Sequence, residues 1–321
     1  MEEFNFSRLK NFSISFLSIP LGLIGFTLTY VKAEQILKIP FKLSNYLLYF
    51  TLLVSVIIFS LYVWKLIRLP NEVKKEFNHP IKLNFFPIFA KVFLISSIIL
   101  LETNLLLSKY FWWIGVILQS GFTLIILSVW IKHNKFEVHH INPSWFIPIV
   151  GTIIIPIAGI KHFSPELSWF FFSAGIVWWL ILLVIVINRM IFNHPIPDKL
   201  VPTLFILFAP PAIGFISYFK LIGEITPFAK MLYYFSLFMF VLVLCQIRMF
   251  TRIRFYLSWW AYSFPLVALT VATLLMYLKT QLLFFSVLSW ILFASLHIII
   301  ILLIFKTIIT ISRKGICVED D

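Results

Sequence analysis

The feature that most constrains this chain is a series of long apolar runs that are almost free of charged residues. A helix of about 20 apolar residues crosses the roughly 30 Å hydrocarbon core of a bilayer. Reading from one charge to the next gives ten such runs, and the sequence therefore predicts an all-α integral membrane protein with ten transmembrane helices. The predicted spans are Asn11–Val31, Leu43–Trp64, Leu83–Leu101, Tyr110–Ile131, Asn142–Ile160, Leu167–Asn188, Leu200–Phe219, Met231–Ile247, Phe255–Leu278 and Gln281–Phe305.

Composition excludes a water-soluble domain. The chain is 61% hydrophobic and 12% charged, whereas soluble proteins contain about 25% charged residues. The 26 Lys and Arg against 13 Asp and Glu would suggest nucleic-acid binding in a soluble chain. In a membrane protein such an excess sets the topology, so the expected partners are the lipid bilayer and small solutes, with no nucleic acid. Cys245 and Cys317 are too few for a disulfide framework.

The positive charges predict the orientation. An even number of spans puts both termini on one side, and 17 of the Lys and Arg residues fall on that side against eight on the other. The positive-inside rule then places both termini in the cytoplasm, with the protein in the cell (plasma) membrane. Since all loops are short, we expect a cytoplasmic N-tail at residues 1–10, one membrane domain at 11–305 and a cytoplasmic C-tail at 306–321.

The prolines predict how the helices are arranged. A proline inside a helix removes a donor and bends the helix, which hydrocarbon does not tolerate unless protein or a water-lined cavity surrounds the bend. We therefore expect five helical hairpins, with an inner ring of odd helices around a pore and the even helices outside. Prolines are common in transmembrane helices in general, but this does not explain why they fall on the odd spans and not on the even ones. Seven lie inside the spans and away from the first turn, all on odd spans: Pro20, Pro87, Pro148, Pro156, Pro210, Pro211 and Pro265.

Several of these proline-containing segments resemble the tellurite-resistance/dicarboxylate transporter family. That family includes bacterial tellurite-resistance protein A, the plant guard-cell slow anion channels, and fungal malate and sulfite transporters. The resemblance runs from about Phe12 to about Tyr277. The segments that carry it are SIPLGL (18–23), HP (79–80) with NFF (84–86), NPSWFIP (142–148), PTLFILFAPPA (202–212) and WWAYSFP (259–265).

The resemblance implies a homotrimer in which each protomer has its own pore. Five odd helices, kinked at Pro20, Pro87, Pro148, Pro210 and Pro265, would line this pore, and a phenylalanine of the ninth helix would block its middle. The matching residue is Phe264, two positions after Tyr262. Because side chains two apart in a helix point to different faces, at most one of these two aromatics blocks the pore axis unless Pro265 distorts the turn. The alternative for Phe264, among 37 phenylalanines, is ordinary packing.

Charged residues within spans are expensive and therefore informative. Lys91 lies inside the third span, four residues after Pro87 and on the same helical face. If that face lines the pore, the ammonium attracts anions; the alternatives are that Lys91 extends to the interface or pairs at a subunit contact. All thirteen carboxylates lie in tails, loops or at helix ends, with Glu102 nearest to a span interior. Coupled carriers usually hold a carboxylate within the membrane.

These observations favour an anion channel or channel-like uniporter. The alternative is a secondary carrier or exporter of a small oxyanion or dicarboxylate, such as malate, sulfite or tellurite. No aspartate-rich Mg²⁺ motif, His-Glu-x-x-His motif or Gly-rich phosphate loop occurs, so we expect no enzyme and no cofactor. His139 and His140 lack a neighbouring cysteine or carboxylate cluster, so we expect them to be solvated or helix-capping rather than ligands of a metal.

Overall fold

The computed structural model describes residues 8–132, 136–313, 315 and 317; residues 1–7 and 318–321 of the predicted tails lie outside this range. Ten helices of the described chain are long and apolar enough to cross a membrane, which confirms the predicted all-α, ten-span class. Several helices continue past the first charge, where the sequence reading ended them. Their bounds are Ile14–Ile36, Ser44–Arg68, Lys82–Leu100, Leu105–Lys132, Pro143–His162, Pro165–Phe192, Asp198–Ile222, Pro227–Leu244, Leu257–Thr280 and Leu283–Ser312.

Burial divides the ten spans into two classes that alternate along the chain. In the odd spans, 78–100% of the most hydrophobic window is buried inside the protein, whereas in the even spans the share is 28–39%. A helix that is apolar on all sides is stable in water only when it is buried, and in a membrane its exposed apolar face contacts lipid. The odd spans therefore form the interior of the bundle, and the even spans carry its apolar outer surface.

Each inner span is built from two segments, a 3₁₀ helix followed by an α-helix. The expectation that the prolines bend continuous α-helices needs correction here. Pro20, Pro87, Pro148, Pro210 and Pro265 all lie at or near the junction, in the first turn of the α-helix or directly before it, whereas Pro156 lies inside the continuous α7. The segments are η1 (Ile14–Leu17) with α2 (Ser18–Ile36), η2 (Lys82–Phe85) with α5 (Ile88–Leu100), η4 (Pro143–Phe146) with α7 (Ile147–His162), η5 (Asp198–Phe208) with α9 (Ala209–Ile222), and η6 (Leu257–Tyr262) with α12 (Ser263–Thr280).

The 3₁₀ segments satisfy the carbonyls that the prolines leave without an α-helical partner. Proline has no N–H to give to the carbonyl four residues earlier. At Pro148, that carbonyl belongs to Ser144 and accepts a bond from the N–H of Ile147, the residue directly before the proline. Before Pro210, the N–H of Ala209 donates to the carbonyl of Ile206 in the same way. Before Pro87, the N–H of Phe86 donates to the carbonyl of Leu83. The tighter turn therefore keeps the backbone bonded inside an apolar bundle.

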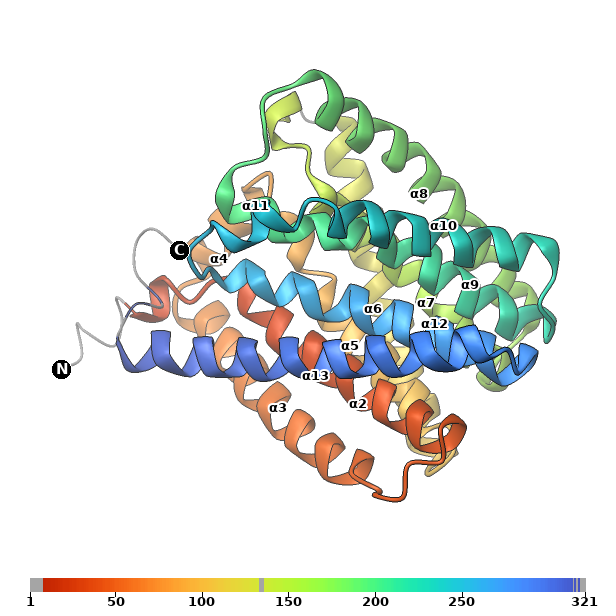
Figure 1. Cartoon of the computed structure of the whole chain (residues 1–321). Coiled ribbons are helices and arrows are strands. Elements are labelled where there is room, and N and C mark those ends of the chain that lie inside the picture. Colours follow the sequence, from red (N-terminus) through yellow and green to blue (C-terminus); the bar gives the residue numbers. More distant parts are fainter. Residues whose placement is uncertain (1–7, 133–135, 314, 316, 318–321) are drawn as a thin grey trace.

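Five longer helices follow the inner spans and pack beside them: α3 (Ser44–Arg68), α6 (Leu105–Lys132), α8 (Pro165–Phe192), α10 (Pro227–Leu244) and α13 (Leu283–Ser312). Each contacts the inner helix that directly precedes it. The short helices η3 (Val138–His140), α4 (Pro70–Asn78) and α11 (Ile247–Thr251) belong to the loops on the side where the described chain begins and ends, as Figure 1 shows for α4 and α11.

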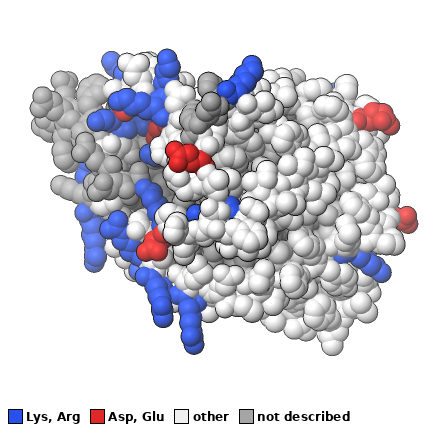
Figure 2. All heavy atoms as spheres, turned by 90° about the horizontal axis from the view of Figure 1, so that it is seen from above, with Lys and Arg blue, Asp and Glu red and all other residues white. Residues whose placement is uncertain are grey.

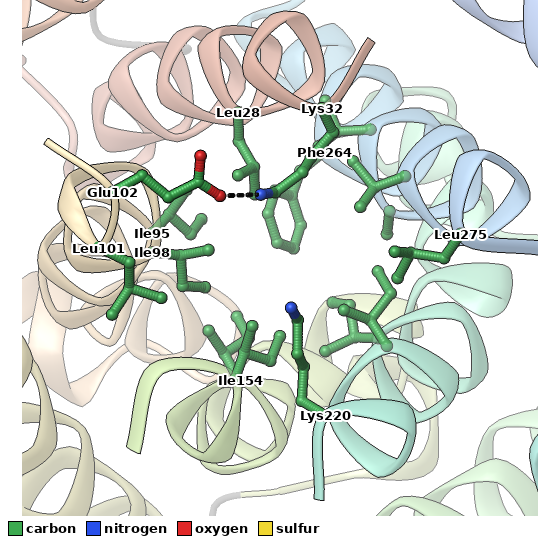
Figure 3. A pocket seen from close by; sticks show the side chains of 16 residues that line it. Leu28, Lys32, Ile95, Ile98, Leu101, Glu102, Ile154, Lys220, Phe264 and Leu275 are labelled. Carbon is green, nitrogen blue, oxygen red and sulfur yellow. Dashed lines mark hydrogen bonds and ion pairs between the residues drawn. The ribbon is translucent and has the colours of Figure 1, made fainter. Parts of the chain in front are cut away.

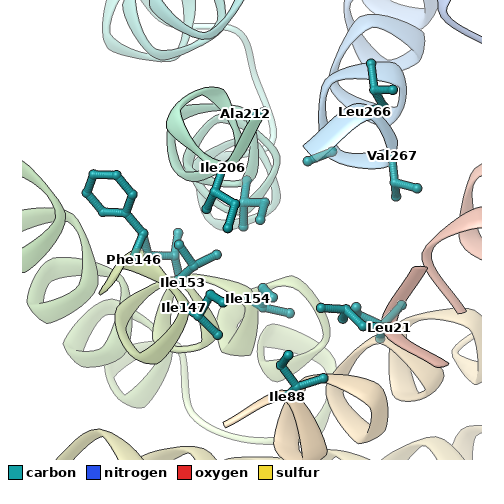
Figure 4. Packing of buried hydrophobic residues seen from close by; sticks show 14 of the residues in the cluster. Leu21, Ile88, Phe146, Ile147, Ile153, Ile154, Ile206, Ala212, Leu266 and Val267 are labelled. Atoms are coloured by element: carbon teal, nitrogen blue, oxygen red, sulfur yellow. The ribbon is translucent and has the colours of Figure 1, made fainter. Parts of the chain in front are cut away.

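Each inner helix contacts the next one along the chain: α2 contacts α5, α5 contacts α7, α7 contacts α9, and α9 contacts α12. α12 in turn contacts α2. Apolar side chains from all five lie between them, including Leu21, Ile88, Ile153, Ala212 and Val267 (Figure 4). α2 and the η6–α12 span approach closely at Gly22, where an added Cβ would lie 2.4 Å from Ser263 Oγ. A larger residue would therefore push these two spans apart.

Charged residues gather at one end of the bundle. Figure 2 shows most of the visible Lys and Arg side chains at the end where the first and last described helical residues lie, with few at the opposite end. We call these the proximal and the distal end. This distribution agrees with the count along the sequence and is the asymmetry on which the positive-inside rule operates.

Candidate functional site

Two cavities lie among the inner spans, and each is lined by residues from all five. The distal cavity has a volume of about 80 Å³ and its wall includes Leu28, Ile95, Ile154, Ile213 and Val271. The proximal cavity has a volume of about 40 Å³ and lies at the 3₁₀–α junctions, where its wall includes Ser18, Ile88, Ile147, Ala209 and Trp260. Since one water needs roughly 10–15 Å³ of such volume, both cavities are large enough for a few waters or a small anion.

The lining residues follow one face of each inner helix. On α5 they are Ile88, Lys91, Ile95 and Ile98, at alternating spacings of three and four, and α7 repeats this spacing. Such spacing keeps side chains on one side of an α-helix. On every inner span the proximal residues precede the distal ones, and all five spans run in the same direction, so the two cavities are stacked along the bundle.

Phe264 is the residue that the described linings of both cavities share. It lies in the first turn of α12 and points into the hollow between the helices (Figure 3). Gly25 of α2 faces this part of α12, because a Cβ added at Gly25 would lie 3.1 Å from Val267 Cγ2 and 3.4 Å from Phe264 Cδ2. Tyr262 lines neither cavity and instead packs on Phe205, with ring centroids 4.7 Å apart. The two aromatics thus have different surroundings, as the two-residue spacing predicts.

Lys91 lies in the wall of the proximal cavity and is 2% exposed. Its ammonium donates a hydrogen bond to the carbonyl of Ile147 at the start of α7 and makes no ion pair with a described carboxylate. It therefore neither extends to the lipid interface nor lies on an outer surface of the protomer. One backbone carbonyl accepts one hydrogen bond from the Lys91 amine, so an amine with unused hydrogen-bonding capacity borders a mostly apolar cavity.

The sequence did not predict that three charged residues line the distal cavity, because each was taken to lie just beyond the end of a span. Lys32 and Lys220 belong to α2 and α9, and Glu102 follows α5; all three line the cavity. Lys32 Nζ lies 3.1 Å from Glu102 Oε1, and Lys220 extends from the opposite wall (Figure 3). The signal was present in the sequence, since Glu102 lies four residues after Ile98 and Lys220 four after Ile216 on the stripes that line the cavity.

Other expected lining groups are placed differently. Pro265 lines the proximal cavity, whereas Pro20, Pro87, Pro148 and Pro210 are buried and absent from the described linings. Among the inner-span hydroxyls, those of Thr152, Ser263, Thr270 and Thr273 bond carbonyls of their own helices. Both cavities are therefore lined mainly by apolar side chains, with lysines and one carboxylate, Glu102, among the described lining residues.

Histidines outside the spans have structural contacts at the proximal end. His79 Nδ1 accepts hydrogen bonds from the backbone N–H of Ile81 and Lys82, and burial, together with nearby positive charge, lowers its pKa. The pKa of His140 is lowered by burial and by His139, and its ring takes part in the capping of η3. His140 thus caps η3, which is one of the two roles expected for this histidine pair. Among the described residues, no group of three His, Cys, Asp or Glu side chains could hold a metal ion.

Comparison with known protein families matches residues 11–308 to the SLAC1 family, described as voltage-dependent anion channels. This chain belongs to that family. An uncharacterized transporter of Methanocaldococcus jannaschii is 29% identical over 297 residues, covering 84% of this chain and 86% of the archaeal one. The S-type anion channel SLAH2 of Arabidopsis thaliana is 28% identical over 253 residues, 77% of this chain but 48% of the plant protein. A tellurite resistance protein TehA homolog of Haemophilus influenzae is 24% identical over 259 residues, covering 79% and 78% of the two chains.

The voltage-dependent anion channel match confirms the resemblance drawn from the proline segments. It contains almost all of the ten-helix bundle and every residue named above as lining a cavity. The relatives are named as anion channels, a transporter and a tellurite resistance protein, and none of these names describes an enzyme. This protein is therefore a multi-pass membrane protein of an anion channel and transporter family.

Proposed function

We propose that this protein is a channel or channel-like uniporter through which small anions permeate passively along the two stacked cavities. The observation that carries the proposal is that all five inner spans line both cavities, with Phe264 between them. A continuous route along the bundle exists once that ring is displaced. Phe264 is accordingly the gate, and the junctions at Pro20, Pro87, Pro148, Pro210 and Pro265 shape the proximal part of the route.

In this proposal, lysine side chains along the route select anions over cations. Lys91 places an ammonium beside the proximal cavity with no described carboxylate to neutralise it. At 4 Å and an effective dielectric constant of 20, two unit charges interact by about 4 kcal/mol. A cation beside Lys91 would be repelled by a similar amount, so the cavity favours anions over cations.

Passive permeation is favoured over coupled transport by where the carboxylates lie. Proton- or sodium-coupled carriers use acidic groups near the middle of the membrane. The described linings contain one carboxylate, Glu102, which lies beyond the end of α5 and is paired with Lys32. The second candidate is a carrier or exporter of an oxyanion or dicarboxylate, malate-, sulfite- or tellurite-like, favoured by the tellurite resistance relative.

Purified protein in liposomes separates these two functions. Vesicles loaded with chloride, nitrate or malate are placed in an anion gradient, and efflux is followed with and without valinomycin and potassium to clamp the potential. A channel gives efflux that depends on valinomycin, is unaffected by a pH gradient and does not saturate at low concentration. Electroneutral efflux driven by a pH gradient would refute the channel proposal and support the carrier.

The proposal includes the setting in which the pathway works. Both termini are cytoplasmic in the plasma membrane, which the charge excess at the proximal end supports. Residues 11–305 form the transporting domain, between the tails at 1–10 and 306–321. Three protomers assemble through part of the exposed apolar surface of the outer helices, each with its own pathway. Cross-linking or mass measurement of the purified protein tests the trimer.

A further inference from the structure

Several charged side chains lie at or near the mostly apolar distal cavity. Lys32, Lys220 and Glu102 line it, and Lys161 and Lys279 lie near enough for their charges to act on Lys220. These five side chains carry four positive charges and one negative charge. Positive side chains around a narrow opening raise the local concentration of anions.

The single carboxylate is already engaged. Glu102 Oε1 lies 3.1 Å from Lys32 Nζ, and Glu102 Oε2 accepts a bond from the amide of Gln35. Lys32 also donates to Gln35 Oε1 at 3.1 Å. Lys32, Gln35 and Glu102 therefore form one closed polar cluster on the α2–α5 side of the cavity.

Lys220 differs from Lys32, because no ion pair joins it to a carboxylate in the described part of the chain. Its amine projects toward the middle of the hollow from the α9 wall, opposite the Lys32–Glu102 pair (Figure 3). A half-buried ammonium without a partner is stabilised when an anion supplies the missing negative charge.

We propose that the distal cavity is an anion-capture site in which Lys220 is the main ligand and Glu102 is a built-in competitor. Glu102 occupies Lys32, so an entering small anion binds Lys220 and has to displace the carboxylate to reach the second ammonium. Glu102 thereby weakens binding and speeds release, which a conduction pathway requires. This inference rests on the proposed function in one respect, that the anion which binds here also permeates.

Anion-dependent thermal stability of the purified protein tests the site without any transport. Chloride replaces gluconate at constant ionic strength, and the chloride concentration that gives half of the maximal shift in Tm is measured. We expect Lys220→Gln to raise that concentration at least fivefold and Glu102→Gln to lower it at least threefold. Lys230→Gln, which removes an exposed lysine near the start of α10, is the matched control and should stay within twofold of the parent.

Two results would overturn the inference. One is a half-maximal chloride concentration for Lys220→Gln equal to that of Lys230→Gln. The other is a half-maximal chloride concentration for Glu102→Gln that is the same as, or higher than, that of the parent. Charge reversal gives a second check that does not depend on one variant folding well. Lys220→Glu should abolish the chloride-dependent shift in Tm if Lys220 is the main ligand.

The capture site and the channel proposal can fail independently. If chloride binding follows this pattern but no anion permeates the liposomes, the capture site stands and the channel proposal fails. If anions permeate while these variants bind chloride alike, the channel proposal stands and the capture site is refuted.

Discussion

Replacing Phe264 with alanine should open the pathway. The ring lies between a distal cavity of about 80 Å³ and a proximal cavity of about 40 Å³, and its removal joins them. We expect the chloride current or flux to rise at least tenfold, which corresponds to about 1.4 kcal/mol or more removed from the permeation barrier. The series Phe264→Leu, Phe264→Val and Phe264→Ala should show currents that increase as the side chain becomes smaller.

The stability of this variant can be estimated from the same geometry. A Phe→Ala change in a packed core costs roughly 3–5 kcal/mol. The Phe264 ring borders a cavity on two sides and has fewer packing partners, so we expect a cost of about 2 kcal/mol or less. The variant should therefore fold, and its Tm in detergent confirms this before currents are compared.

Tyr262→Ala is the matched control, since it removes an aromatic ring two residues away that lines neither cavity. Tyr262 is 7% exposed and packs on Phe205, Phe250 and Trp259, so its loss should cost roughly 3–5 kcal/mol with no gain in current. A folded Phe264→Ala protein whose flux equals that of the parent would refute the gate. Equal gains in Phe264→Ala and Tyr262→Ala would show that general loosening, rather than a gate, controls permeation.

Three further predictions concern charges and titration. Lys91→Met removes the buried ammonium, so the chloride-to-sodium permeability ratio from reversal potentials should fall at least tenfold; an unchanged ratio would exclude Lys91 from selection. Lys65 Nζ is buried 3.3 Å from Glu76 Oε1, so Glu76→Ala leaves a buried charge unpaired and should cost about 3 kcal/mol or more in thermal unfolding. Glu72→Ala, which breaks the exposed pair with Lys75, should cost less than about 1 kcal/mol, and equal losses would contradict this reasoning. Because the pKa of His79 in the folded protein lies below its ordinary value of 6.5, the unfolded chain binds a proton first as pH falls. The stability from neutral His79 is thus complete above about pH 6.5 and is lost as pH falls toward the lower folded pKa. Tm between pH 5 and 8 should show this loss in the parent and a smaller loss in His79→Asn.

The alternation of inner and outer helices could be predicted from the sequence, because a proline leaves a backbone carbonyl without its helical partner and hydrocarbon cannot bond it. Pro20, Pro87, Pro148, Pro210 and Pro265 all lie in spans that the structure buries. Their local effect could not be predicted, since a proline alone does not determine whether the helix bends or is preceded by a 3₁₀ turn. The bond from Ile147 N–H to the Ser144 carbonyl depends on a 3₁₀ turn that the surrounding helices stabilise.

The placement of charged residues required the structure for a related reason. The sequence reading ended each span at its first charge, so Lys32 and Lys220 were counted as loop residues, although α2 and α9 continue through them. A charge at the end of an apolar run can face solvent, lipid headgroups or a cavity. Which of these occurs depends on the rotation of the helix against its neighbours.

The sequence by itself determined the number of spans, their class and the family, because crossing a bilayer imposes a length and a hydropathy that each segment satisfies alone. The tertiary structure decided that Phe264 borders two cavities and that Lys91, Lys32, Lys220 and Glu102 line them. These facts depend on how five helices pack against one another. No single segment contains that information, since a cavity is defined by side chains that are far apart in the sequence.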